Sequence, residues 1–201
     1  LGAEDIINAA AVAACADFLD AQPAGQLLSI GGSIPHWEND AWSRLRDGFE
    51  RWLARGILVV DTYGPPLAWF SPRRAALVKI NRREFAGLAG VDRNAATDEK
   101  MPELLNRVAA SSPIERWVIT DGPNLVWLRD RDGPITCAPP PRVVEVSPTG
   151  SGDVFLAGLL YAVFERQHTL GDAVDFALPL GAANAASPEV AEFDLGPFGF
   201  A

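Results

Sequence analysis

The sequence predicts an α/β fold: a three-layer α/β/α sandwich around a mainly parallel sheet. Short apolar runs alternate with segments of helical periodicity, which is typical of a sheet covered by helices on both faces. The run Ile57–Val60 is apolar without polar alternation, as in a strand buried on both sides. Polar and glycine residues follow directly after such runs, where parallel sheets bind ligands. We expect one domain over residues 1–201.

Each element is predicted from its own pattern, in chain order. Helices are expected where apolar residues recur every three or four positions, and strands where a short apolar run ends at turn residues. The expected elements are helix Ala3–Leu19, strand Gln26–Ile30, helix Asn39–Arg55, strand Ile57–Val60, strand Ala76–Ile80, helix Asn81–Leu88, helix Pro102–Ala110, strand Trp117–Thr120, hairpin strands Leu125–Arg129 and Pro134–Ala138, strand Val143–Val146, and helices Val154–Phe164 and Leu170–Ala186.

Composition and charge exclude several classes of function. The chain of 201 residues carries 17 Lys and Arg against 26 Asp and Glu, a net charge of −9. Such an acidic chain lacks the basic footprint of a nucleic-acid binder and would be repelled by anionic membranes, so neither partner is expected. The two cysteines form no metal-ligand cluster, and no secretory signal is visible, so we expect a cytoplasmic protein. The chain begins with Leu1 rather than Met, which suggests part of a longer protein.

The segment from Val146 to Phe155 carries the strongest chemical signal. An expected strand ends, the loop Ser147–Asp153 follows, and an apolar helix begins. Unpaired amides and a positive dipole at such a helix start favour an anion, and Gly150 and Gly152 allow its close approach. Asp153 beside a bound phosphate suits a base that accepts a proton from an attacking hydroxyl. The alternative is a tight turn with Asp153 as a helix cap. No P-loop occurs in the sequence. The Gly-x-Gly-x-x-Gly fingerprint of dinucleotide-binding folds is also absent, which disfavours a nicotinamide oxidoreductase.

Several segments together resemble the ribokinase-like, or PfkB, carbohydrate kinases. Ser147-Pro148-Thr149-Gly150-Ser151-Gly152-Asp153 is similar to their carboxy-terminal signature, Asn-Pro-x-Gly-Ser-Gly-Asp in the hexose-phosphate branch. The other motifs follow in family order between about Gln26 and Ala186. Gly32-Ser33-Ile34-Pro35 and Asp61-Thr62-Tyr63-Gly64 resemble loops of 1-phosphofructokinases and tagatose-6-phosphate kinases, Lys79-Ile80-Asn81-Arg82-Arg83-Glu84 resembles Lys-Pro-Asn-x-x-Glu, and Thr120-Asp121-Gly122 resembles Thr-x-Gly.

The resemblance implies an ATP-dependent transfer of the γ-phosphate to a sugar or sugar-phosphate hydroxyl. Asp153 would be the catalytic base, and the amides of Gly150, Ser151 and Gly152 would hold the transferred phosphate. Thr120, Gly122 and Asn184 would line the nucleotide. Asn81 and Glu84 would act around Mg²⁺, through water. Such kinases lead us to expect ATP and Mg²⁺ as cofactors and a homodimer as one assembly.

Simpler interpretations accompany several of these residues. Asn81 with Glu84 three positions later is also a helix-capping pattern, and Thr120–Gly122 could form an ordinary turn. Most of the six tryptophans are expected in the core, with Trp37 and Trp69, beside loops, as exceptions. Arg82 and Arg83, inside a matched motif, are candidates for phosphate contacts.

The chain also departs from the family pattern. Ser147 stands where many relatives have Asp, and the amino-terminal sugar-binding segment and lid strands of the family have no counterpart here. The alternative function is therefore a catalytically reduced nucleotide- or sugar-binding protein of the same fold.

Overall fold

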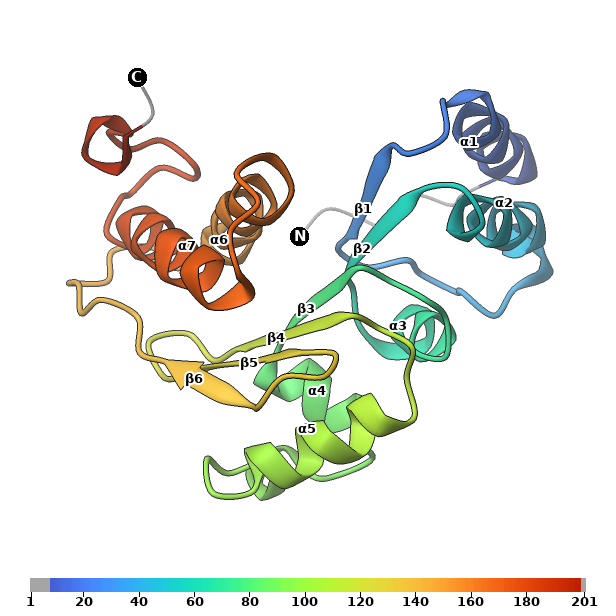
Figure 1. Ribbon diagram of the computed structural model, residues 1–201. Coiled ribbons are helices and arrows are strands. Elements are labelled where there is room, and N and C mark those ends of the chain that lie inside the picture. The colour runs from blue at the N-terminus through green and yellow to red at the C-terminus, as the bar shows by residue number, and fades with distance from the viewer. Residues whose placement is uncertain (1–7, 200–201) are drawn as a thin grey trace. The chain divides into compact units, whose positions relative to one another are not determined.

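The computed structural model describes residues 8–199, and the start of the expected helix Ala3–Leu19 lies outside this range. Six strands hydrogen-bond into one sheet in sequence order, β1 to β6 (Figure 1). The chain divides after Trp117 into two compact units. The mixed α/β class predicted from the sequence is confirmed. No helix within residues 8–199 is both long and apolar enough to cross a membrane.

The first unit alternates helices and strands. Its elements are α1 Ala9–Ala21, β1 Leu27–Gly31, α2 Ser43–Leu53, β2 Ile57–Asp61, α3 Gly64–Phe70, β3 Leu77–Asn81, α4 Arg82–Leu88 and α5 Met101–Ala110. Strand β1 pairs with β2 and β2 with β3, both in parallel. Strand β3 is buried along its first four residues, as expected of a strand covered on both faces.

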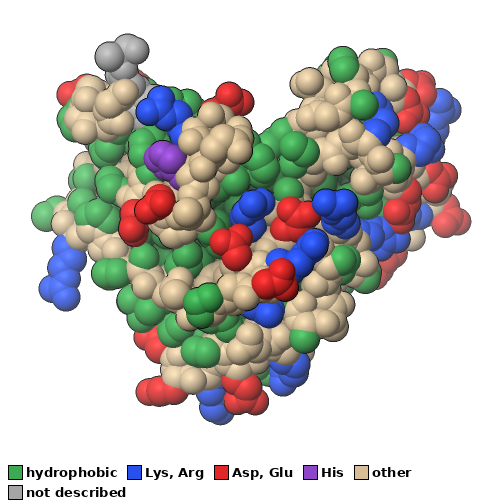
Figure 2. Space-filling model, viewed as in Figure 1, with side chains coloured by type: hydrophobic (Ala, Val, Ile, Leu, Met, Phe, Trp, Pro, Cys, Tyr) green, Lys and Arg blue, Asp and Glu red, His purple; other side chains and the backbone are tan. Residues whose placement is uncertain are grey.

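Helices α1 and α2 pack against one another and are linked by exposed ion pairs. Arg51 contacts Asp20 at 2.7 Å and Arg44 contacts Asp17 at 2.5 Å. Red and blue side chains therefore mingle over these helices in Figure 2. Arg55, just beyond α2, donates to the backbone carbonyls of Leu19 and Gln22 at the end of α1. These two bonds give Arg55 a place at the carbonyl end of α1, where the last carbonyls of a helix lack intrahelical donors.

The second unit begins inside β4, Arg116–Thr120. Strands β5 Val126–Asp130 and β6 Thr136–Ala138 form the expected antiparallel hairpin. Helix α6, Ser151–Leu160, continues as a π-helical turn over Tyr161–Glu165, and α7 spans Leu170–Ala185. Helices α6 and α7 pack closely: a Cβ on Gly158 would lie 2.6 Å from Leu180 Cδ1.

Two sequence predictions need correction. Helix α3 was not predicted, although Pro65 and Pro66 stand in its first turn, where proline is favoured. The expected strand Val143–Val146 is wrong, because the segment forms no strand and all four residues are exposed. Val144, for example, is 85% exposed. An apolar run needs a partner strand to become part of a sheet, and composition alone does not supply one.

Candidate functional site

A glycine turn opens helix α6. Gly150 is the residue before the helix and has a φ of +78°, a left-handed conformation that strains other residues. A Cβ at this position would also lie 2.4 Å from Cγ1 of Val190. The backbone angle therefore favours glycine at position 150, and a Cβ there would also force the exposed Val190 side chain to shift.

The backbone amides of this turn are partly free. The Ser151 N–H donates to the Pro148 carbonyl at 3.2 Å, so it is engaged within the protein. Within residues 8–199, no protein group accepts a hydrogen bond from the N–H groups of Gly150, Gly152 or Asp153. Of the three amides expected to hold a phosphate, those of Gly150 and Gly152 remain available. The Asp153 carboxylate is exposed beside them and has no hydrogen-bond donor within the same residues.

Asn184 of α7 holds the glycine turn in place through hydrogen bonds. Its side chain is fully buried and donates to the Thr149 carbonyl at 2.8 Å and to Ser151 Oγ at 2.9 Å. Its oxygen accepts from the Ala191 N–H at 2.7 Å. These three bonds tie the glycine turn and the segment after α7 to one amide. The geometry supports a positioning role for Asn184, and its expected contact with a nucleotide stays a prediction.

A cavity of about 470 Å³ lies beside the turn. Four of the predicted residues line it: Thr120 at the end of β4, Gly122 just after β4, and Ser151 and Gly152 at the start of α6. Its other walls are largely apolar, with Pro123, Val126, Pro140, Pro141, Val143, Pro148, Phe155, Leu178, Gly181, Ala182 and Ala185 beside Arg142 and Glu145. An apolar cavity of this size with a few polar groups is typical of a small-molecule site.

In the first unit, Asn81 and Glu84 form a capping box at the start of α4. Asn81 Oδ1 accepts from the Glu84 N–H at 3.0 Å, and Glu84 Oε2 accepts from the Asn81 N–H at 2.8 Å. The structural alternative raised for this pair is therefore realised. Burial raises the pKa of the Glu84 carboxyl, and the nearby Asp61 carboxylate raises it further, against the Asn81 hydrogen bonds and Lys79.

Asp61, at the end of β2, pairs with a lysine. Lys79 Nζ lies 2.8 Å from Asp61 Oδ2, and the two side chains are only 8% and 13% exposed. Each of the two buried charges needs the other, because removing one partner would leave an unpaired charge inside the protein and would destabilise the fold. The pair therefore fixes the carboxyl ends of β2 and β3 beside Glu84.

The oxygen ligands of this region are suited to Mg²⁺. Within the described residues, no three His, Cys, Asp or Glu side chains are grouped to bind a metal by themselves. Mg²⁺, however, usually takes only one or two protein carboxylates and completes its shell with water and substrate phosphates. The nearby Asp61 carboxylate repels a negative charge on Glu84, and a bound cation would reduce that repulsion. The residues present therefore fit this mode of Mg²⁺ binding.

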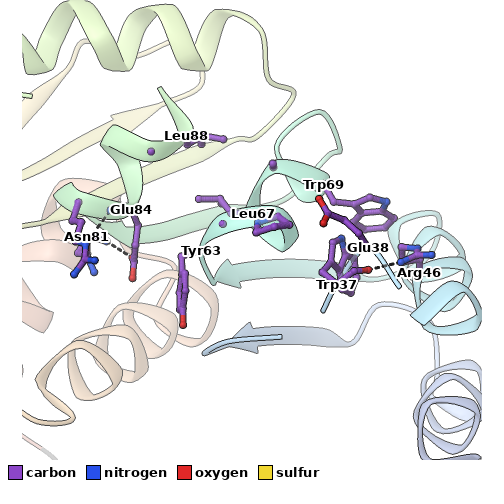
Figure 3. A pocket seen from close by; sticks show the side chains of 14 residues that line it. Trp37, Glu38, Arg46, Tyr63, Leu67, Trp69, Asn81, Glu84 and Leu88 are labelled. Atoms are coloured by element: carbon purple, nitrogen blue, oxygen red, sulfur yellow. Dashed lines mark hydrogen bonds between the residues drawn. The ribbon is translucent and has the colours of Figure 1, made fainter. Parts of the chain in front are cut away.

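The sequence did not predict a second, larger cavity in the first unit. It is an open cavity of about 970 Å³ that lies between the segment after β1 and the helices α2, α3 and α4. Figure 3 shows Trp37, Glu38, Arg46 and Trp69 at one end and Asn81 with Glu84 at the other. Trp69 is half-buried and lines this cavity, as expected of a tryptophan outside the core. The same expectation is wrong for Trp37, which also lines the cavity but is only 4% exposed and belongs to the buried core.

The comparison with protein families decides the family. The model described as "pfkB family carbohydrate kinase" matches residues 71–194. The chain belongs to the pfkB family of carbohydrate kinases. The matched range includes Asn81, Glu84, Thr120, Gly122 and the whole glycine turn. A comparison with curated proteins finds no match.

Solved structures show the same pfkB-type fold at low sequence identity. Phosphofructokinase-2 from Escherichia coli in complex with fructose-6-phosphate has a TM-score of 0.78 at 19% identity, over 92% of this chain and 59% of that one. The tetrameric inhibited form of the same enzyme gives 0.76 at 20%, over 89% and 58%. Fructokinase from Vibrio cholerae O395, in a fructose-, ADP- and calcium-bound form, gives 0.63 at 19%, over 85% and 57%. The chain thus spans less than two thirds of these pfkB-like proteins.

Proposed function

We propose that this pfkB family chain acts in an ATP-dependent carbohydrate kinase that phosphorylates a hydroxyl of a sugar or sugar phosphate. One observation carries the proposal: the Gly150 turn leaves the Gly150 and Gly152 amides free at the start of α6, with the Asp153 carboxylate unengaged beside them. Free amides at a helix start favour an anion, and the carboxylate supplies a base. The loop motifs favour a hexose phosphate, as in the 1-phosphofructokinase and tagatose-6-phosphate kinase branch.

The cavity beside the turn is proposed to hold the nucleotide. Its apolar walls would pack against the base, and Thr120 and Gly122 would lie along the nucleotide. Ser151 and Gly152 line one side of the cavity, so the phosphates of a nucleotide bound there would lie next to the helix start. Asn184 would act through the turn, because its amide is already bonded to Thr149 and Ser151.

In the proposed reaction, Asp153 accepts the proton of the acceptor hydroxyl. The hydroxyl oxygen forms a bond to the γ-phosphorus while the bond from that phosphorus to the bridging oxygen breaks, and ADP leaves. The amides of Gly150 and Gly152 hold the charge that develops on the transferred group. Mg²⁺, held through water near Asn81 and Glu84, would neutralise phosphate charge. We further propose a cytoplasmic protein, and the homodimer stays a prediction.

The proposal is tested by ADP release from ATP with D-fructose, fructose 1-phosphate, fructose 6-phosphate and tagatose 6-phosphate. We expect turnover with at least one of them. The variant Asp153→Asn should reduce kcat at least about a hundredfold, because it cannot accept the proton, while ATP binding stays close to that of the unmodified chain. Asp175→Asn, which alters an exposed carboxylate on α7, is the matched control and should leave kcat unchanged.

Two outcomes would count against the proposal. Near-normal turnover by Asp153→Asn would remove the base assignment. ATP binding without turnover on any acceptor would favour the alternative, a nucleotide-binding protein of reduced activity.

A further inference from the structure

The segment after α7 folds back onto the glycine turn, and we call its residues 187–192 the strap. Its Val190 side chain lies beside Gly150, because a Cβ added to Gly150 would be 2.4 Å from Val190 Cγ1. The proposed phosphoryl transfer uses no residue of the strap, although the strap contacts the turn that is proposed to hold the phosphate. The strap is thus placed to influence the geometry of that turn.

The strap is a short turn closed by its own hydrogen bonds. Ser187 Oγ accepts from the Glu189 N–H at 3.2 Å and donates to the Glu192 carbonyl at 2.9 Å. The Ser187 N–H donates to the Asn184 carbonyl at 3.0 Å, which joins the strap to the end of α7. These three bonds favour one shape for the whole segment.

Ala191, within the strap, has a strained backbone. Its φ is +58°, in the left-handed region that is unfavourable for a residue with a Cβ. Strain of this kind persists only where surrounding contacts hold it. The Ala191 N–H donates to Oδ1 of the fully buried Asn184 at 2.7 Å. This bond therefore holds the strap in a conformation that Ala191 by itself disfavours.

The same bond selects the orientation of the Asn184 amide. The oxygen of an amide side chain accepts hydrogen bonds, whereas its nitrogen donates them. Because the Ala191 N–H needs the oxygen on its side, the nitrogen donates to the Thr149 carbonyl at 2.8 Å and to Ser151 Oγ at 2.9 Å. Without the Ala191 N–H, the buried amide oxygen would lose its donor, and this orientation would lose the contact that selects it.

We propose that the Ala191 N–H is a positioning group for the phosphate-binding turn, so that phosphate binding and attachment of the strap are coupled. The coupling runs from Ala191 through the Asn184 amide to the two residues that flank Gly150. Release of the strap would loosen the turn and weaken its contacts to phosphate, and a bound phosphate would stabilise the attached strap by the same factor. The assignment of a phosphate to this turn rests on the proposed kinase function.

The test compares the affinities of the 201-residue chain for ATP and for adenosine, each measured by calorimetry in the presence of Mg²⁺. Ala191→Pro removes the N–H and excludes a positive φ. We expect this variant to weaken ATP binding at least about fivefold, the lower end of the usual range for coupled sites. Adenosine binding should stay unchanged, because adenosine has no phosphate to contact the turn. Ala191→Gly keeps the N–H and tolerates the left-handed backbone, so it is the matched control with unchanged ATP affinity.

Two further measurements follow the path of the coupling. Asn184→Ala should also weaken ATP binding, and adding Ala191→Pro to it should cause no further loss, because both changes break the same connection. In the unmodified chain, ATP should slow hydrogen exchange at the Ala191 amide, by about the factor by which Ala191→Pro weakens ATP binding. Adenosine should leave that exchange rate unchanged.

Three results would overturn the inference: unchanged ATP affinity in Ala191→Pro, an equal loss of ATP and adenosine affinity, or the same effect of Ala191→Pro with and without the Asn184 side chain. An equal loss for both ligands would give the strap only a general structural role. ATP binding and turnover by the unmodified chain report the proposed function separately. A chain that phosphorylates a sugar and keeps its ATP affinity in Ala191→Pro would refute this inference and leave the kinase function intact, whereas failure of the unmodified chain to bind ATP would overturn both.

Discussion

Replacing Gly150 by alanine tests whether the turn before α6 needs glycine for two separate reasons. A left-handed backbone at φ +78° costs a residue with a Cβ about 1–2 kcal/mol. The new Cβ would also lie 2.4 Å from Val190 Cγ1, so one of the two residues must shift. Val190 is 53% exposed and has room to move, which places this cost near the lower end of overpacking, about 1 kcal/mol. We expect Gly150→Ala to lower the free energy of unfolding by about 2–3 kcal/mol.

The two contributions can be separated by urea unfolding of matched variants. Gly25→Ala carries a similar φ of +82° with nothing within 4 Å of its Cβ, so it should cost only the backbone part, about 1–2 kcal/mol. Adding Val190→Ala to Gly150→Ala should recover the overlap cost, about 1 kcal/mol. ADP affinity should fall in Gly150→Ala and remain unchanged in Gly25→Ala. If Gly150→Ala is no worse than Gly25→Ala, and Val190→Ala recovers nothing, the steric reasoning is wrong.

Two further predictions concern the residues around the site. Asn184→Ala removes three hydrogen bonds and leaves their buried partners unsatisfied. We expect thermal or urea unfolding to show that the free energy of unfolding falls by about 2–4 kcal/mol. A decrease below about 1 kcal/mol would contradict the proposed positioning role of Asn184. Burial raises the pKa of Glu84 above its unfolded value, so the folded state binds the proton more tightly, and the Glu84 contribution to stability should increase as pH falls through that raised pKa. The difference in unfolding free energy between the unmodified chain and Glu84→Gln, measured between neutral and mildly acid pH, should therefore change with pH, and a constant difference would refute the shift.

Much of the fold could be predicted because its elements follow local rules. Strands β2 and β3 are buried apolar runs, and α2 has strict helical spacing, so both patterns indicate which residues are buried. The segment Val143–Val146 has the same composition as a strand, but pairing depends on a neighbour that composition does not specify. Helix α3 is short, and its proline start was the only local signal.

The candidate site was predictable to the extent that its residues are close in sequence. The turn from Gly150 to Asp153 and the capping box of Asn81 and Glu84 are local motifs, and both form. The engagement of Ser151 by Pro148 and of Asn184 by Thr149 depends on the local course of the loop and on how α7 packs beside it. The larger cavity combines segments from Trp37 to Leu88, which only the folded chain brings together.

We propose that the free amides at the start of α6 hold the transferred phosphate. It is tested most directly by following the amide ¹H–¹⁵N resonances of Gly150 and Gly152 during titration with ATP. We expect both resonances to shift saturably, with the same dissociation constant as calorimetry gives, and the resonance of the Gly25 amide, which donates to the Arg55 carbonyl, to remain unshifted. Saturable ATP binding that leaves the Gly150 and Gly152 resonances unmoved would contradict it.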